Sequence, residues 1–501
     1  MVPNGFPSDE MVTRLQKERG DFIASDLKRY ILDRDIHLMN FCYVGGDGRL
    51  KALSFALRDE QHICRLLYDG ERIDGSSLFG YIDPGASDLY VIPRYATAFE
   101  NPFTEERTLN VLCNYFDSKG QPLAMAPENL TLSAQAAVSE RLGLQMHALG
   151  ELEYYVVYRP ESELYPGIPQ RNYHESPPFV KWAVMRERAI CELARLGAQV
   201  KYAHAEVGDV VTEANLRMEQ HEIEFLPEPL GVAADHVVLA KWLLRNLSSR
   251  AGVAVTFAPK LAAGHAGNGM HFHLELLREG ANALIDARDE LTDVSFKAIT
   301  GMLDNATALT AFGNKVPTSY LRLVPHQEAP TSICWGEANR SALVRVPLAW
   351  RGTSAMAARV NPKDADALKR KSVGRQTIEW RASDGSANAH QLIAGLAAAI
   401  LHGHRESDAS ARAEQLRFEG SIFDDELQMD AAEKLPGSCE ESAQALLAHR
   451  DTFERDRIFP PALIDGIARE LAAFEDRELL TKARGDAELT AKLAGQYFHC
   501  G

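Results

Sequence analysis

Two histidines follow a glycine-rich turn in the segment AGHAGNGMHFHLEL, residues 263–276. The three glycines of this turn are Gly264, Gly267 and Gly269. They allow the backbone to bend sharply and to come close to a bound group. From His271 onward polar and apolar residues alternate, which predicts a β-strand with His271, His273 and Glu275 on one face. That face could bind a metal ion, a phosphate or only water, and the segment alone leaves the three alternatives open.

Three further segments repeat this alternation of polar and apolar faces: GELEYYVVY, QHEIEFLP and TIEWRASD. In a single strand this pattern is equally typical of an antiparallel sheet that has one face in water. Across all four strands, however, the polar faces are dominated by carboxylates and imidazoles. Their charged or ionisable residues are Glu151, Glu153, Glu222, Glu224, His271, His273, Glu275, Glu379 and Arg381.

Carboxylates gathered on one surface repel one another unless cations neutralise them. Oxygen-rich sites with an occasional imidazole suit Mg²⁺ or Mn²⁺. Zinc fits less well, because neither a thiolate nor an H-E-x-x-H pattern accompanies His271 and His273. The sequence therefore predicts a divalent-cation site on the shared polar face.

Three arginines lie close together in the segment 320–347, YLRLVPHQEAPTSICWGEANRSALVRVP. They are Arg322, Arg340 and Arg345. Arginine binds carboxylates and phosphates in a bidentate manner, although surface ion pairs are the simpler interpretation of this segment alone. The chain has no G-x-x-x-x-G-K-[ST] motif, so a nucleotide would have to be held by cations and arginines rather than by a P-loop.

The elements that must position these residues predict an α+β fold. Residues 10–34 are typical of a charged helix, and short alternating segments over 36–120 predict a small, mostly β domain. We therefore expect one domain over residues 1–121 and a second over 122–501 that ends in a helical region at about 408–490. The second domain should contain helices near 130–143, 177–197, 233–251 and 388–403, and strands near 148–158, 221–226, 253–258, 269–277 and 376–382.

Composition narrows the classes of function. The net charge of −16 disfavours nucleic acid or a membrane surface as a partner. Seven cysteines without a C-x-x-C pair favour reduced thiols and a cytoplasmic location. The most apolar run, residues 392–401, is too short to span a membrane, so it predicts a buried helix.

Six motifs in order resemble the glutamine synthetase family, over about residues 36–475. They are IDGSS, GELEYY, GNGMHFH, RLVPHQEAP, NRSALVRVP and IEWRASDGSANAHQLIAGLAAAILHG. The resemblance implies a β-grasp-like N-terminal domain and a catalytic domain with a curved antiparallel sheet. It also implies a glutamate–ammonia ligase, in which ATP phosphorylates the γ-carboxylate of glutamate and ammonia then displaces the phosphate.

The same resemblance implies roles for individual residues. Two or more Mg²⁺ or Mn²⁺ ions would be bound, one by Glu151, His271 and Glu379 and another by Glu153, Glu206 and Glu222. Glutamate would be bound by Gly267, Arg322, Glu328 and Arg381, and ATP by His273, Arg340 and Arg345. The catalytic residues would be Asp74, Glu328 and Arg340, with Asp74 binding ammonium and Glu328 on a flap that closes the site.

Three departures from the family pattern affect these assignments. Eight extra residues separate Glu206 from Glu222, so Glu213 could replace Glu206 as a ligand. We expect the inserted segment 209–217 to form a loop or hairpin that returns the chain to the same sheet. Ala266 replaces an asparagine of the glycine loop, and Glu275 replaces a serine near the nucleotide.

Other functions remain open alongside glutamate–ammonia ligase. A ligase that joins glutamate to a larger amine would share the fold and the phosphoryl-transfer residues, and a catalytically silent structural or regulatory paralogue would share only the fold. The resemblance further implies a large homo-oligomer of two stacked hexameric rings, with active sites between neighbouring subunits.

Overall fold

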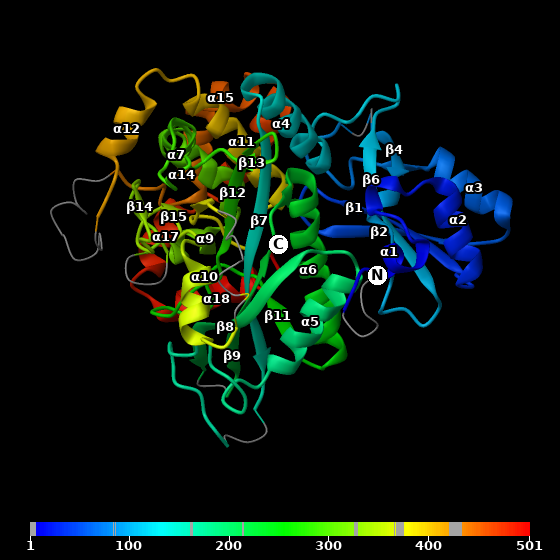
Figure 1. Cartoon of the computed structure of the whole chain (residues 1–501), viewed down its shortest axis with the longest axis horizontal. Helices are drawn as coiled ribbons and strands as arrows, with labels where there is room; N and C mark the ends of the chain where they lie inside the picture. The colour runs from blue at the N-terminus through cyan, green and yellow to red at the C-terminus, as the bar shows by residue number, and fades with distance from the viewer. Residues whose placement is uncertain are drawn as a thin grey trace.

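The computed structural model describes residues 7–83, 85, 87–160, 164–212, 215–324, 329–364, 366, 375–419 and 433–501. Its N-terminal part, blue to light blue in Figure 1, contains three α-helices, two 3₁₀ helices and six strands within the described residues. The helices are α1 (Glu10–Leu15), η1 (Arg19–Asp21), α2 (Ala24–Asp33), α3 (Glu60–Asp69) and η3 (Tyr95–Thr97). The strands are β1 (Leu38–Val44), β2 (Leu50–Ala56), β3 (Glu71–Asp74), β4 (Asp88–Pro93), β5 (Phe99–Glu100) and β6 (Thr108–Phe116).

The prediction of one charged helix over residues 10–34 is wrong. The chain forms two separate α-helices there, because Gln16 adopts a left-handed conformation with φ of 54° and ends α1. The extended backbone of Ile23 then precedes α2. Charge patterning does not reveal this interruption, since both helices carry the same kind of surface.

The six N-terminal strands form one mixed sheet in the order β2-β1-β6-β4-β3, with β5 paired to β6. The parallel pairing of β1 with β6 places the two most buried strands side by side at its centre. The helix α3 precedes β3, and the turn that follows β3 begins at Asp74. The predicted small, mostly β domain is therefore present.

A second sheet of ten strands forms the centre of the rest of the chain, in the order β14-β15-β16-β12-β7-β9-β8. Its long strands are β7 (Gln145–Tyr158), β8 (Val200–Val211), β9 (Arg217–Phe225) and β12 (Met270–Arg278). The short ones are β10 (Glu228–Pro229), β11 (Ala254–Thr256), β13 (Ala281–Asn282), β14 (Trp335–Glu337), β15 (Val344–Val346) and β16 (Ile378–Trp380). All strands that carry the predicted polar residues thus belong to one sheet.

The described ends of the inserted segment, residues 209–212 and 215–217, continue the β8–β9 hairpin, as predicted. The two strands pair antiparallel out to Val211 and Arg217, and the pairing is irregular between Ala205 and Asp209. Near the tip, Arg217 donates to Asp209 in a buried ion pair. The extra residues therefore lengthen the hairpin and leave Glu206 on the central sheet.

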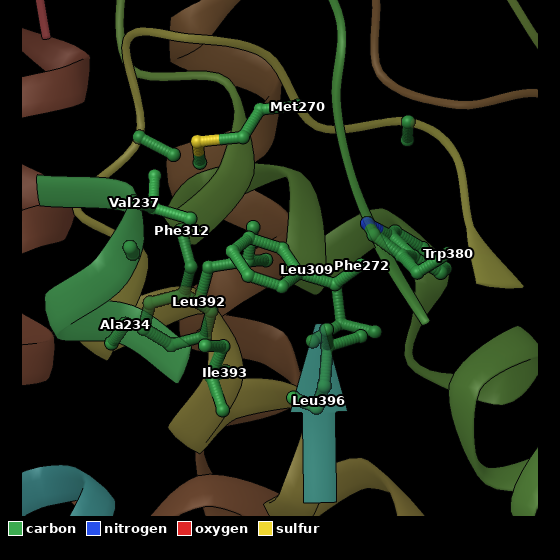
Figure 2. Close-up of a cluster of buried hydrophobic side chains, with 14 of the residues drawn as sticks. Ala234, Val237, Met270, Phe272, Leu309, Phe312, Trp380, Leu392, Ile393 and Leu396 are labelled. Carbon is green, nitrogen blue, oxygen red and sulfur yellow. The ribbon is translucent and has the colours of Figure 1, made fainter. Parts of the chain in front are cut away.

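Helices cover the apolar face of the large sheet. Those that contact its strands are α4 (Pro127–Leu142), α5 (Ala183–Arg195), α6 (Leu230–Arg250) and α7 (Asp293–Asp304), and α11 (Ala389–Gly403) packs against α4, α6 and α7. The other helices of this part of the chain are α8 (Ala306–Gly313), α9 (Pro317–Arg322) and the exposed α10 (Thr353–Val360). Figure 2 shows Met270 and Phe272 of the sheet close to Val237 of α6 and Leu392 of α11, with Trp380 beside Phe272. This core fixes the strands, so the alternate residues must point to the opposite, polar side.

The predicted buried helix over 392–401 lies within α11, in which every residue except His402 is buried. The C-terminal region is helical where the structure describes it, as predicted, and residues 420–432 lie outside the described part. Its helices are α12 (Ala409–Gln415), α14 (Cys439–Ala448), α15 (Arg450–Glu454), α16 (Pro461–Ala472), α17 (Arg477–Ala483) and α18 (Ala487–Gln496). Among the described residues, no helix has the length and apolar character needed to cross a bilayer.

The two sheets are joined by polar and aromatic contacts. Arg94 of the N-terminal part donates to Asp235 of α6 at 2.8 and 3.1 Å, and His390 of α11 lies 3.2 Å from the same carboxylate. Phe99 packs against Trp242 with ring centroids 5.8 Å apart. The position near residue 121 that we predict as the domain boundary lies between β6 and α4.

One close helix crossing gives a test of the packing. An added methyl group on Gly301 of α7 would lie 2.1 Å from the backbone oxygen of Ala399 in α11. Because backbone cannot move aside cheaply, we expect Gly301→Ala to lower the free energy of unfolding by about 3 kcal/mol or more. Gly495→Ala is the matched control, since its methyl group would meet no atom within 4 Å. Urea denaturation of both variants measures the effect, and equal stabilities would contradict the packing.

Candidate active site

A cavity of about 210 Å³ opens over the polar face of the large sheet. The described residues that line this cavity lie between Leu149 and Arg381 in the sequence. It includes most of the predicted site residues: Glu151, Glu153, Glu206, Glu222, Gly267, His271, His273, Arg340, Arg345 and Arg381. Glu379 and Arg322 do not line this cavity but contact residues that do.

Strand register places these side chains in rows across the sheet. One row runs Arg345, Glu379 and His273 over β15, β16 and β12. A second runs His271, Glu151, Glu224 and Tyr202 over β12, β7, β9 and β8. A third runs Glu153, Glu222 and His204 over β7, β9 and β8. Neighbours in a row lie on the same face and within reach of one another.

The first carboxylate–imidazole group consists of Glu151, His271, His273 and Glu379. Glu151 lies 3.1 Å from Nδ1 of His271 and 2.9 Å from Nε2 of His273. Glu379 is fully buried and lies 3.8 Å from His271 and 3.9 Å from His273. The predicted ligands Glu151, His271 and Glu379 are thus brought together, with His273 beside them.

The first group keeps its carboxylates ionised. Burial works against the charge of Glu151, but His273 and His271 hold the pKa of Glu151 well below its ordinary value. Burial also opposes the charge of Glu379, yet Arg381 and His273 lower the pKa of Glu379 to about 2. Arg381 donates to Oε1 of Glu379, and Arg345 donates to Oε2 at 2.7 Å.

The second group consists of Glu153, Glu206 and Glu222, and it lacks such compensation. Burial, together with the charges of Glu222 and Glu153, raises the pKa of Glu206 to about 8. Burial and the charges of Glu151 and Glu153 raise the pKa of Glu222 well above its ordinary value. Crowded, buried carboxylates of this kind fit a divalent cation, which would replace the missing positive charge.

The donor set of both groups therefore fits Mg²⁺ or Mn²⁺. In the part of the chain that the structure describes, three groupings of carboxylates and imidazoles have ligand atoms within 4.8 Å of one another. They are Glu151–His273–Glu379, Glu151–Glu222–His271 and His204–Glu206–Glu222. Oxygen ligands dominate each grouping, in keeping with these hard cations.

Gln220 holds the glycine loop against the second group, a role that the sequence reasoning missed. Its fully buried amide donates to Glu153 at 3.1 Å and to the carbonyl of Gly267 at 3.0 Å. Gly269 N also donates to Glu153 Oε2, at 2.7 Å. One carboxylate oxygen of Glu153 is thereby fixed, and the other is left toward the cavity side, 3.9 Å from His271.

Both arginines predicted to bind glutamate are buried, but only Arg381 lines the cavity. Arg322 is buried and donates to the carbonyl of Ala382 at 2.8 Å, with His271 3.2 Å away. Arg381 lines the cavity and donates to Glu379. Arg340 lines the cavity from an exposed position, where arginine is free to meet a phosphate.

Some predicted residues lie elsewhere. Asp74 is exposed at the end of β3 and does not line this cavity, so the single chain does not bring it to the other site residues. Hydrogen bonds from Ser77 and Ser76 hold the pKa of Asp74 below its ordinary value. Glu328 and Glu213 lie outside the described residues. Glu275 does not line the cavity either, and its carboxylate accepts from Asn282 at 3.1 Å.

Gly269 gives a test of the site geometry. A methyl group there would lie 2.5 Å from His271 Nε2, 2.7 Å from Arg322 Nη2 and 3.0 Å from Glu153 Oε1. We expect Gly269→Ala to lower kcat/KM of the reaction catalysed at this site about 100-fold, since displacement of site groups by about 1 Å has effects of this size. The melting temperature should change little because the three atoms are side-chain ends. Steady-state kinetics test this against Gly495→Ala, and normal kinetics in Gly269→Ala would contradict the geometry.

Comparisons with known proteins agree with this architecture. Residues 35–118 match the glutamine synthetase β-grasp domain, and residues 127–469 match the glutamine synthetase catalytic domain. Glutamine synthetase from Thermococcus kodakarensis is 30% identical over 413 residues, which cover 82% of each chain. Glutamine synthetase from Methanococcus maripaludis is 27% identical over 442 residues, covering 87% of this chain and 90% of the relative.

Solved structures show the same fold. Glutamine synthetase from Plasmodium falciparum superposes with a TM-score of 0.73 at 18% identity, covering 91% of this chain and 96% of that one. A complex of GmaS with ADP superposes with a TM-score of 0.69 at 20% identity, covering 92% and 99%.

A β-grasp domain followed by a catalytic domain with a curled, largely antiparallel sheet defines a class of ligases. Within that class, the chain belongs to the glutamine synthetase family.

Proposed function

We propose that this protein is a glutamate–ammonia ligase that forms glutamine, ADP and phosphate from glutamate, ammonium and ATP. One observation carries the proposal: the first and second groups, each fit for a divalent cation, lie at one cavity together with a set of arginines. Such a cavity provides positive charge where a phosphoryl group passes from ATP to a carboxylate.

Each carboxylate group has a part in this proposal. Glu151, His271 and Glu379 would hold one cation, and Glu153, Glu206 and Glu222 another. When bound, Mg²⁺ or Mn²⁺ neutralises and orients the transferring phosphoryl group. The extended β8–β9 pairing supports Glu206 rather than Glu213, because Glu206 lies in the cavity lining beside Glu222.

The remaining residues would bind and orient the substrates. Arg322, Arg381 and the backbone at Gly267 would bind the carboxylates of glutamate, and for Arg322 this requires its guanidinium to exchange its contact with His271. Arg340, Arg345 and His273 would bind ATP, with Arg340 also stabilising the transferring phosphoryl group. Both arginines in the ATP site suit phosphate oxygens through their bidentate donors.

Ammonium selection would depend on Asp74 and Glu328. A carboxylate attracts the ammonium cation and accepts a proton from it before the amine attacks the acyl phosphate. Glu328 would also close the site and exclude water from that intermediate.

Because Asp74 lies outside the cavity of its own chain, we propose that a neighbouring subunit supplies it. The assembly would be a large homo-oligomer, two stacked hexameric rings, with active sites between subunits. The acidic chain would need neither nucleic acid nor membrane as a partner, and we place it in the cytoplasm.

A ligase for a larger amine is the second candidate, since GmaS shares the fold. Asp74 and Glu328 favour ammonium, because an amine pocket would be expected to replace one of them with a smaller or apolar residue. A silent paralogue is disfavoured by the predicted cation-binding and arginine residues gathered around one cavity.

Trapping of the intermediate tests the proposed reaction. With glutamate, ATP and Mg²⁺, hydroxylamine should convert the acyl phosphate into γ-glutamyl hydroxamate, with one ADP formed per hydroxamate. The iron-complex colour assay measures the product, and reactions without ATP or without Mg²⁺ are the controls. Absence of hydroxamate while ADP accumulates would contradict phosphorylation of the γ-carboxylate.

A further inference from the structure

His204 borders the second carboxylate group, although the proposed function gives it no role. It lies on β8 and faces Glu222 across the strand pairing. Its Nε2 atom is 3.0 Å from Oε2 of Glu222, and its Nδ1 atom is 3.6 Å from Oε2 of Glu206. The imidazole and both carboxylates offer ligand atoms within 4.8 Å of one another.

The other ring nitrogen of His204 has a backbone partner. Nδ1 lies 3.0 Å from the carbonyl oxygen of Ala205, which can only accept a hydrogen bond. The proton of a neutral imidazole is then on Nδ1, and the lone pair is on Nε2, directed at Glu222. This is the arrangement found in metal-binding histidines, which commonly donate their second N–H to a carbonyl or carboxylate.

Neighbouring residues hold this ring in place. His174 packs on His204 with ring centroids 4.3 Å apart, and Tyr173 stacks on His174 at 4.2 Å. The backbone of His174 has a left-handed φ of 57° and donates to the same Ala205 carbonyl at 2.9 Å. A strained residue that supports a ring at the rim of a cavity is a feature of functional sites.

We propose that His204 is an imidazole ligand of the second cation position, together with Glu206 and Glu222, and that it makes this position favour Mn²⁺ over Mg²⁺. The 3.0 Å separation of Nε2 and the Glu222 oxygen suits two neighbouring ligand atoms on one cation. An imidazole ligand suits transition metals, whereas Mg²⁺ prefers oxygen ligands only. The inference rests on one part of the proposed function, the binding of a divalent cation by the second group.

A different role for His204 would be a protonated imidazole that forms an ion pair with Glu222. In that case His204 would position the carboxylate without contacting the metal. Only as a ligand would His204 have a nitrogen coupled to the bound ion. Only in that role would the loss of His204 weaken Mn²⁺ binding more than Mg²⁺ binding.

The experiment compares wild-type protein with His204→Asn, which retains a short donor but has no imidazole. Mn²⁺ and Mg²⁺ affinities are measured by isothermal titration calorimetry, and ¹⁴N coupling to Mn²⁺ by pulsed electron paramagnetic resonance. The matched control is His265→Asn, since the Nδ1 atom of His265 also lies 2.9 Å from a local carbonyl, that of Ala263. His265 belongs to none of the three carboxylate–imidazole groupings found among the described residues.

We expect His204→Asn to weaken one Mn²⁺ site about tenfold or more. Mg²⁺ affinity should change by less than about threefold, and the ¹⁴N signal per bound Mn²⁺ should fall. Unchanged Mn²⁺ affinity and ¹⁴N signal would overturn the proposal, as would equal losses for both metals with the ¹⁴N signal retained. A wild-type protein that binds Mn²⁺ in this way but makes no glutamine would contradict the proposed function and leave this inference standing.

Discussion

Replacement of Glu379 by alanine is expected to lower the ligase activity about 1,000-fold or more. Glu379 is fully buried, pairs with Arg345 and Arg381, and lies within 4 Å of His271 and His273. Its loss would remove an anionic ligand from the first group and leave two arginines without their shared carboxylate. Because buried cations without a partner are costly, Glu379→Gln is the second variant, which keeps the side-chain volume and removes only the charge.

The measurement is glutamine formation at saturating Mg²⁺, with circular dichroism to confirm folding. Glu275→Ala is the matched control, because Glu275 lies on the same sheet, two residues from His273, and does not line the cavity. Near-normal turnover in Glu379→Gln would show that the ligand assignment is wrong.

Removal of the Asp74 charge is expected to lower kcat/KM for ammonium about 100-fold. The KM values for ATP and glutamate should change little, and hydroxylamine should be less affected because it needs less help with deprotonation. Asp74→Asn is the preferred variant, since Asp74 accepts hydrogen bonds from Ser76 and Ser77 within its turn, which an amide oxygen can partly retain. Equal use of ammonium by variant and parent would remove Asp74 from the ammonium site.

Mixed oligomers test whether Asp74 acts on a neighbouring subunit. Chains with Asp74→Asn alone should keep about 1% of the ammonium-dependent activity, and chains with Glu379→Gln alone still less. If every active site combines residues of two subunits, random co-assembly should restore about a quarter of the sites, the fraction in which both contributing chains carry the intact residue. A mixture that regains no activity after unfolding and reassembly would contradict the shared site.

Period-two alternation predicted which side chains point to the polar face, because strand geometry alone fixes the face of each residue. Glu151, Glu153, Glu222, His271 and His273 were identified in this way, and all of them line the cavity. Alternation does not reveal where along a strand a cavity ends. Glu275 has the same pattern as His273 but lies beyond the cavity.

The sequence did not predict the register of the paired strands or the contacts made by the loops. The alignment of His204 with Glu222 depends on how β8 pairs with β9, including the irregularity after Ala205. The position of His204 two residues before Glu206 was the available signal, since it places both side chains on one face. Gln220 gave no comparable signal, because its role depends on contact with Gly267, which is distant in sequence.

The choice between ammonium and a larger amine tests the central claim most directly. The measurement is ATP-dependent phosphate release with glutamate and Mg²⁺, comparing ammonium with methylamine, ethylamine and longer diamines, with each product identified by mass spectrometry. We predict that kcat/KM for ammonium exceeds that for every other amine by about tenfold or more, with glutamine as the product. Preferential formation of a γ-glutamyl amide of a larger amine would contradict the assignment as a glutamate–ammonia ligase.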